Sequence, residues 1–342
     1  MFNNPSHTPA IFVPGWLLIP KRQASGALNY KHDCKVQNSH TAALCRRTMM
    51  RGPKTVVLTG GSEGIGYEAC RQLATLPGCE KIVLTSRSEA RATAATEALA
   101  KLTGKPLTLF GVCALDNNSP KSIKAAVAAM PTGIDALILN ASAPPPMPIS
   151  KMSTERAGVA ECMQGTCVGN LELLEGLIAA KKLSKGCRVI FSGSELTRKT
   201  WLFTGLQPSV VLNKGKIAAH VSSPPSDCVP IRSSFAAYST AKLIATLAIS
   251  GLAKEHPDFY FATVSPGGVA TNLYKQLPQP MSGLMLHCSC MFVAFRAAHS
   301  VEEGAKRYVD AVARDDFPSV FPSGAVLASP SSCCPSGGGW VL

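Results

Sequence analysis

The chain has 342 residues, of which 46% are hydrophobic and 16% charged; this composition fits one large globular domain or two small ones and excludes disorder throughout. No uncharged apolar run is long enough for a membrane-spanning helix, which disfavours an integral membrane protein. The formal net charge of +13 is concentrated before residue 55, where there are eight basic residues and one acidic residue. The chain has no basic blocks interleaved with aromatic residues, and this argues against a nucleic-acid-binding protein.

Residues 1–52 lack sustained helical or strand periodicity and are rich in Pro, Ser, Thr and Asn, so we expect an unstructured basic leader. A basic, acid-poor N-terminus of this kind is similar to an organelle transit peptide, which would direct the protein to a mitochondrion or plastid. Because Met49 and Met50 directly precede the first predicted strand, a non-targeting extension of a cytoplasmic protein is the alternative. A signal sequence or membrane anchor is a third.

The thirteen cysteines are scattered and include no CxxC pair. No His/Cys cluster completes a zinc pattern, so we expect reduced thiols and no metal. A metal or redox site at Cys288 and Cys290, or at Cys333 and Cys334, is the alternative.

From Lys54 onward, short apolar runs alternate with Ala-rich helical stretches, which is the signature of βαβ units and a parallel sheet. A buried strand at 56–59 runs directly into a glycine turn, residues 59–66, and then into a helix predicted at 67–76. Glycines let a backbone approach a pyrophosphate, and the N–H groups at the start of a helix bind its charge. A tight strand-to-helix turn without a ligand is the alternative.

Three further strands are predicted at 81–85, 107–112 and 135–139, and a fifth at 187–191. They are followed in turn by Arg87, by Asp116, by Asn140-Ala141-Ser142 and by Ser192-Gly193-Ser194. A later strand ends in the turn at 265–271. A helix at 301–313 and a short strand at 325–328 complete the predicted sheet.

Tyr238 and Lys242 form a YxxxK pair in an Ala-rich helical context, so they stand about one turn apart on one face. A free phenol titrates near 10 and is a poor base at neutral pH. An ammonium one turn away would stabilise the phenolate and lower that pKa. Tyr238 could then give a proton to a carbonyl or take one from an alcohol.

The TGxxxGxG turn, the YxxxK pair and the Pro266-Gly267 turn, in this order and context, resemble the short-chain dehydrogenase/reductase family over about residues 54–328. The resemblance implies an α/β fold: a single doubly wound Rossmann-type domain at 53–328, with a parallel sheet of about seven strands. An insertion would occupy 195–235, and residues 329–342 would be a loose tail. The activity implied is NAD(P)-dependent interconversion of a carbonyl and an alcohol by hydride transfer.

The same resemblance implies the site residues, and no metal among them. The catalytic positions would be those of Ser194, with Ser192 as second choice, and of Tyr238, Lys242 and Thr166. The cofactor-binding positions would be Thr59, Gly60, Ser62, Gly64, Ile65, Gly66, Arg87, Asp116, Asn140, Ala141, Tyr238, Lys242, Pro266, Gly267, Val269 and Thr271.

The choice of cofactor depends on two charges. Arg87 stands where an NAD-specific member of the family carries an acid, which favours the 2′-phosphate of NADP. Glu63 stands in the glycine loop where NADP-preferring relatives often carry a base, so NAD is the alternative. Asp116 would contact the adenine; a helix-starting acid is the alternative for it.

Three departures from the family pattern qualify the expected activity. Thr166 replaces the Asn that usually takes part in a water-mediated proton relay, and we interpret the nearby Asn170 as an ordinary helix residue. Ser142 replaces a Gly. Ser194 and Tyr238 are 44 positions apart, whereas the family commonly has about a dozen intervening residues. A catalytically weak or inactive nucleotide-binding regulatory or scaffold protein is therefore the alternative function.

The segment 273–295 is rich in Met, Leu and Phe, in the region that the family uses as a variable substrate lid. Its character favours a small or medium apolar substrate or peripheral contact with a membrane surface. A buried helix or a face between copies of a homo-oligomer explains the same residues.

Overall fold

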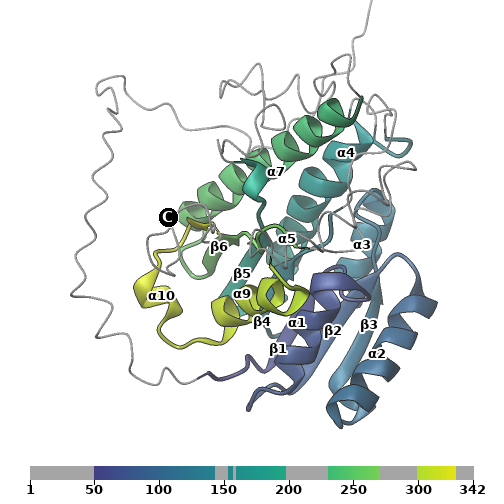
Figure 1. The fold of residues 1–342 in the computed structure, drawn as a ribbon, viewed down its shortest axis with the longest axis vertical. Coiled ribbons are helices and arrows are strands. Elements are labelled where there is room, and N and C mark those ends of the chain that lie inside the picture. Colours follow the sequence, from purple (N-terminus) through teal and green to yellow (C-terminus); the bar gives the residue numbers. More distant parts are fainter. Residues whose placement is uncertain (1–49, 143–152, 157–158, 198–229, 270–298, 329–342) are drawn as a thin grey trace, which may run out of the picture.

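The computed structural model describes residues 50–142, 153–156, 159–197, 230–269 and 299–328 (Figure 1). Its strands form one parallel sheet in the order β3-β2-β1-β4-β5-β6-β7. This confirms the predicted doubly wound α/β fold with seven strands. The strands are β1 (Thr55–Leu58), β2 (Lys81–Ser86), β3 (Phe110–Ala114), β4 (Ile134–Leu139), β5 (Leu183–Ser192), β6 (Tyr260–Val264) and β7 (Ala325–Leu327).

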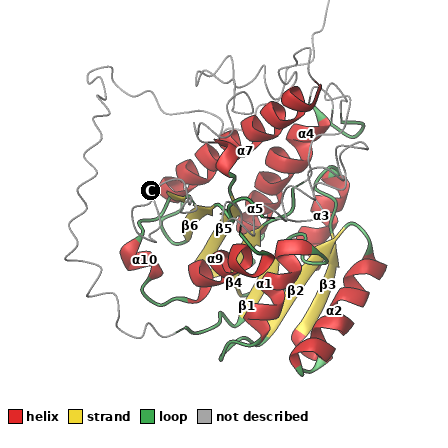
Figure 2. Ribbon diagram, viewed as in Figure 1, coloured by secondary structure: helices red, strands yellow, loops and turns green. Residues whose placement is uncertain are grey.

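Helices cover both faces of the sheet (Figure 2). The helices are α1 (Gly64–Ala74), α2 (Glu89–Thr103), α3 (Pro120–Ala129), α4 (Glu161–Met163), α5 (Gly169–Ala179), α7 (Pro230–Glu255), α9 (Val301–Ala313) and α10 (Phe317–Val320). Shorter turns are η3 (Leu107–Leu109), η5 (Glu195–Thr197) and the π-helical η4 (Gln164–Val168).

Two apolar cores lie on the two sides of the sheet. One joins the strands to α3, α5 and α7, and the other joins them to α1, α2 and α9. The middle strands are buried on both faces, as in Val56, Val57 and Leu58 of β1, which have no exposed surface. This is why the central strands read as continuous apolar runs rather than as alternating ones.

Local sequence signals set several helix ends. Ser88 and Ser119 accept hydrogen bonds from backbone N–H groups in the first turns of α2 and α3. Ser300 and Glu303 form a reciprocal capping box at the start of α9, the arrangement that satisfies two otherwise unpaired donors. Gly104 ends α2 in the left-handed region at φ 66°, where glycine carries no Cβ penalty.

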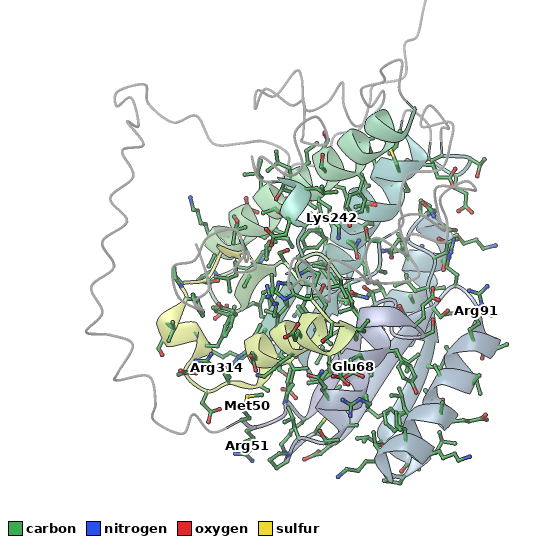
Figure 3. All side chains as sticks on the ribbon, in the orientation of Figure 1. Met50, Arg51, Glu68, Arg91, Lys242 and Arg314 are labelled. Carbon is green, nitrogen blue, oxygen red and sulfur yellow. The ribbon has the colours of Figure 1, made fainter. Side chains whose placement is uncertain are left out.

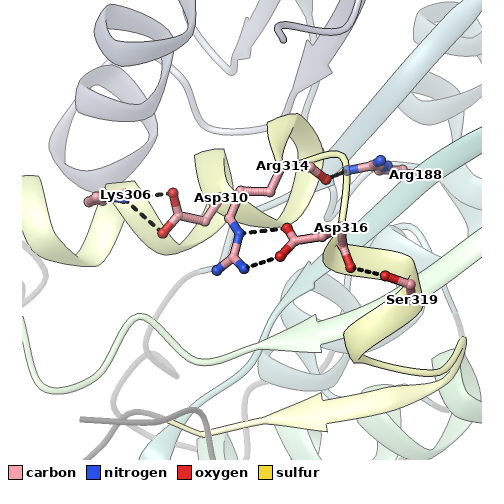
Figure 4. A network of polar contacts seen from close by, with 6 residues as sticks. All are labelled: Arg188, Lys306, Asp310, Arg314, Asp316 and Ser319. Atoms are coloured by element: carbon pink, nitrogen blue, oxygen red, sulfur yellow. Dashed lines mark hydrogen bonds and ion pairs between the residues drawn. The ribbon is translucent and has the colours of Figure 1, made fainter. Parts of the chain in front are cut away.

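A polar network fastens the end of α9 to β5 (Figure 4). Arg188 Nη1 donates to the carbonyls of Arg314 at 2.7 Å and Ala311 at 3.3 Å. Arg314 in turn pairs with both carboxylate oxygens of Asp316, at 3.0 and 2.7 Å. The bidentate pair holds the chain in its turn from α9 into α10.

The structure corrects the predicted boundaries at several places. Residues 107–109 form the turn η3 after Pro106, so the third strand begins at Phe110 rather than at 107. The first helix begins at Gly64, not at Tyr67. Helix α7 begins at Pro230, inside the segment assigned to the insertion, because proline is tolerated in the first helical turn, where its missing N–H would be unpaired anyway.

The last residues assigned to the unstructured leader also lie on the body. Met50 forms an antiparallel bridge with Arg314, Arg51 N donates to Ala313 O, and Gly52 N donates to Pro77 O (Figure 3). These backbone hydrogen bonds order the three residues. The rest of the leader, most of the insertion (198–229), the apolar segment 273–295 and the tail lie outside the described residues.

Candidate active site

The glycine turn after β1 depends on close backbone approach. Gly60 and Gly64 have φ of +68° and +59°, values that favour glycine. A Cβ on Gly66 would lie 2.2 Å from Gly60 O, so only glycine fits where α1 enters. Glu63 at the N-cap of α1 makes no side-chain capping hydrogen bond, so no side-chain cap covers the first-turn N–H groups. The turn therefore has the cradle and the donors that a pyrophosphate needs.

The turn after β4 is fastened to the glycine turn. Asn140 Nδ2 donates to Thr59 O at 3.0 Å and to Gly60 O at 3.3 Å. Ala141 N donates to Thr59 Oγ1 at 2.9 Å. Strands β1 and β4 are where the sheet order reverses, which is the place where open parallel sheets bind their ligands. Asn140, Ala141, Thr59 and Gly60 are thus brought together as expected.

Ser62, Arg87 and Asp116 lie at the ends of the neighbouring strands. Ser62 Oγ donates to Ser86 Oγ at 3.3 Å, and Arg87 follows β2 with an exposed side chain. Asp116 Oδ1 accepts from Asn118 N at 3.0 Å, which closes a local turn before α3. This hydrogen bond stabilises the turn before α3. The contact of Asp116 with an adenine stays a prediction.

Lys242 is enclosed between α7 and the sheet, with 1% of its surface exposed (Figure 3). Its Nζ donates to Ser192 O at 2.7 Å. The same nitrogen lies 4.9 Å from the ring centroid of Phe191 and 5.7 Å from that of Tyr238, distances at which a cation is attracted to a ring face. Burial lowers the pKa of Lys242 from 10.5 to about 7, because desolvation penalises the charged amine.

The two candidate serines have different surroundings. Ser192 is buried, and its Oγ shares a hydrogen bond of 2.7 Å with the Tyr308 hydroxyl of α9. Ser194 is half-buried at the start of η5, where its Oγ accepts from Leu196 N at 3.2 Å and its carbonyl accepts from Thr197 Oγ1 at 2.7 Å. Because the Ser192 hydroxyl is committed to Tyr308, the geometry favours Ser194 as the serine available to a substrate.

Thr166 lies in the π-helical η4 with 1% of its surface exposed. Its Oγ1 accepts from Ser142 Oγ at 3.4 Å, so two of the three departures from the family pattern contact each other. Asn170 lies in helix α5, as the sequence interpretation has it, but it makes contacts that this interpretation did not include. Asn170 is fully buried, and its Nδ2 donates to Ala141 O at 3.0 Å and Thr166 O at 3.1 Å. The sequence signal that could have indicated these contacts is the amide of Asn170 within an apolar helical run.

The turn after β6 lies at the same edge of the sheet as the turns that follow β1, β4 and β5. Ser265 Oγ accepts from Gly267 N at 3.2 Å, and Gly267 has φ of +85°. Val269 forms a parallel bridge with His299, and the buried Arg307 of α9 donates to Ser265 O at 3.4 Å. Pro266 is buried beside this turn. Thr271, the last of the expected cofactor-binding residues, lies outside the described residues.

Other chemistry is limited in the described part of the chain. Its six cysteines are free thiols, and burial raises the pKa of Cys167 to about 12 and that of Cys162 to about 11. Across the same residues, no group of three His, Cys, Asp or Glu side chains could hold a metal ion. No helix found there has the length and apolarity to cross a membrane.

Known proteins resemble this chain in sequence and fold. Residues 54–205 match the family model of short chain dehydrogenases. A (+)-neomenthol dehydrogenase of Arabidopsis thaliana is 26% identical over 258 residues, 65% of this chain and 84% of that protein. Salutaridine reductase from Papaver somniferum has a TM-score of 0.54 at 21% identity, covering 80% of this chain and 99% of that one.

A third relative is L-sorbose reductase from Gluconobacter frateurii, solved in complex with NADPH and L-sorbose. It has a TM-score of 0.55 at 18% identity and covers 82% of this chain and 95% of that one. At such identities the two solved structures establish the fold. The doubly wound sheet with a glycine turn at its switch point defines a Rossmann-type nucleotide-binding protein. The sequence matches add a similarity to short chain dehydrogenases, over residues 54–205 for the family model and over 258 residues for the neomenthol dehydrogenase.

Proposed function

We propose that this chain is an NADP(H)-preferring enzyme that interconverts a carbonyl and an alcohol on a small or medium apolar substrate, with Tyr238 as the proton donor and acceptor. The observation that carries the proposal is Lys242. It is fully buried one helical turn from Tyr238, and its Nζ lies 5.7 Å from the centroid of the Tyr238 ring. A cation placed there stabilises the Tyr238 phenolate and makes proton exchange feasible near neutral pH.

The remaining residues fit this chemistry. A bound nicotinamide cofactor would supply the hydride. The glycine turn and the uncapped start of α1 would hold its pyrophosphate, and Asn140, Ala141, Pro266, Gly267, Val269 and Thr271 would border its nicotinamide end. Ser194 would donate a hydrogen bond to the reacting oxygen. Lys242 would also hold the nicotinamide ribose, and Thr166 would contact a water of the proton relay.

The preference for NADP depends on Arg87. Its guanidinium is exposed directly after β2, where it could pair with a 2′-phosphate. Glu63 is exposed in the glycine turn and opposes it. A relative from Burkholderia cenocepacia was solved with NADP, and the L-sorbose reductase with NADPH, which supports the same choice here. NAD is the alternative cofactor.

The test begins with titration of the full chain with NADPH and NADH. A panel of apolar aldehydes and ketones is then followed by the absorbance of the reduced cofactor. We expect tighter binding of NADPH than of NADH, with turnover of at least one carbonyl. Tyr238→Phe should lower turnover by at least about a hundredfold without changing cofactor affinity.

Tyr260→Phe is the matched control, because it also removes one tyrosine hydroxyl. Tyr260 lies on β6, and its hydroxyl donates to Phe321 O at 3.2 Å. The variant should keep its turnover. Undiminished turnover in Tyr238→Phe would contradict the assigned acid/base.

A second function is favoured by one observation. Thr166 offers no side-chain carbonyl, and its Oγ1 accepts from Ser142 Oγ at 3.4 Å. This arrangement fits a catalytically weak or inactive nucleotide-binding protein with a regulatory or scaffold role. Such a protein would bind NADPH or NADH in the same titration and turn over none of the carbonyls.

A further inference from the structure

Unpaired buried polar atoms gather around η4. Within the described residues, eight buried side-chain nitrogen and oxygen atoms have no hydrogen-bond partner, and five of them belong to Asn117, Asn118, Gln164 and Asn170. A concentration of this kind calls for an explanation, because native proteins leave few such groups unpaired. It singles out one short segment between the turns that follow β3 and β4.

Glycines bring this segment close to the turn after β3. A Cβ on Gly165 would lie 2.7 Å from Asn118 Oδ1, and one on Gly169 would lie 2.2 Å from Asn117 O. Gln164 Nε2 donates to Asn117 O at 3.0 Å. One side of η4 is therefore pinned to the turn after β3, on the proposed adenine side of the crevice.

Asn170 pins the other side to the turn after β4. One amide nitrogen carries two hydrogens. Here they serve Ala141 O at 3.0 Å and Thr166 O at 3.1 Å. Both bonds are buried or partly buried, where a hydrogen bond is stronger and its loss costlier than in water. The Ala141 N–H donates to Thr59 Oγ1, so the contact continues into the glycine turn.

Asn170 lies in the first turn of α5, directly after the π-helical η4. In a π-helix the backbone bonds run five residues along instead of four, and single π-turns inside α-helices are frequent at functional sites. The Asn170 side chain reaches back to the carbonyl four residues earlier and at the same time reaches out to Ala141. A side chain without N–H donors cannot make either bond, however well it fills the space.

We propose that Asn170 is a positioning residue: its side-chain amide holds the turn after β4, at Ala141, in register with Thr166 on η4, and so shapes the wall of the crevice where the nicotinamide end of the cofactor would lie. The cofactor part of this statement rests on the proposed function. The structural part, that Asn170 orders the Ala141 turn, is independent of it.

The test compares two amide-to-apolar replacements in the full chain. Asn170→Leu removes the two donors while keeping about the same volume. Gln164→Met is the matched control, because Gln164 is fully buried like Asn170 but lies on η4 and donates to Asn117 O. Hydrogen exchange of the Ala141 amide is measured without cofactor, and NADPH affinity is measured by titration, both below the melting temperature of each variant.

We expect Asn170→Leu to exchange the Ala141 amide at least about tenfold faster and to weaken NADPH binding about tenfold, which equals the loss of one good hydrogen bond. Gln164→Met should lose comparable thermal stability and leave the exchange of the Ala141 amide within about twofold of the native chain. Asn170→Ser, which keeps one donor, replaces the leucine variant if that variant does not fold, and should show a smaller change in the same direction.

Unchanged Ala141 exchange in either Asn170 variant, or equal effects of the Asn170 and Gln164 replacements, would overturn the inference. A native chain that binds neither NADPH nor NADH would overturn the proposed function instead. The exchange comparison would still decide the role of Asn170.

Discussion

Replacement of Lys242 by Met should make the protein more stable at low pH and remove one pH dependence of its folding. Lys242 is fully buried, and its pKa is lowered from 10.5 to about 7. Below pH 7 the amine is charged in both states, so folding carries the full desolvation cost of the charge. Between pH 7 and 10.5 the unfolded chain binds a proton that the folded chain has released, and the free energy of unfolding rises with pH.

The magnitude follows from the two pKa values. Between pH 6 and pH 9 the linkage relation gives an increase of about 3 kcal/mol in the free energy of unfolding. The buried thiols act in the opposite direction above about pH 9, since burial raises the pKa of Cys167 to about 12 and that of Cys79 to about 11. They are common to both proteins and nearly cancel in the difference between them.

The assay is urea unfolding of the full chain without cofactor at pH 6, 7, 8 and 9, followed by circular dichroism. The stability advantage of Lys242→Met over the native chain should be greatest at pH 6 and shrink by about 3 kcal/mol by pH 9. Lys254→Met, an exposed lysine in the last turn of the same helix, is the control and should show a constant difference. A constant difference for Lys242→Met as well would refute the reasoning.

Two further pairs of replacements test the glycine turn and the two candidate serines. Gly66→Ala places a Cβ 2.2 Å from Gly60 O and should cost about 3 kcal/mol of stability and most of the nucleotide affinity. Gly251→Ala on α7 is the control, because nothing lies within 4 Å of the added carbon, and it should cost neither. Equal urea midpoints for the two variants would contradict the expectation. Ser192→Ala leaves the buried Tyr308 hydroxyl without its 2.7 Å partner and should lower the free energy of unfolding by about 1–3 kcal/mol. It should reduce turnover less than Ser194→Ala does. The reverse order in steady-state rates would exchange the roles of the two serines.

The fold was predictable because its signals are local and repeated. Buried runs such as Val56–Leu58, serine caps before α2, α3 and α9, and the glycines of the turn each act within a few residues. The errors have the same origin. The apolar run from residue 107 was read as a strand, whereas residues 107–109 form η3. Residues 195–235 were read as an insertion, whereas α7 already starts at Pro230.

The candidate site was only partly predictable, because contacts across the sheet leave little trace in a single sequence. Asn140 was expected to follow the fourth strand beside the cofactor, and its side chain joins that turn to the glycine turn through Thr59 O and Gly60 O. The Ser192–Tyr308 hydrogen bond joins residues 116 positions apart, and the Asn170–Ala141 bond joins residues 29 apart. No periodicity or spacing encodes such pairs, so Tyr308 was not considered and Asn170 was undervalued.

The packing of α1 against α9 has a consequence for synthesis of the chain. Apolar residues of both helices share one core, and Gln72 Nε2 donates to Glu302 O across 230 positions of sequence. A ribosome adds roughly 5–20 residues per second. Helix α9 is therefore synthesised roughly 10 to 50 seconds after α1, the helix that it covers. During that interval the nascent chain exposes an apolar surface that a chaperone could bind, and a transcript truncated before α9 would yield a product that keeps this surface open.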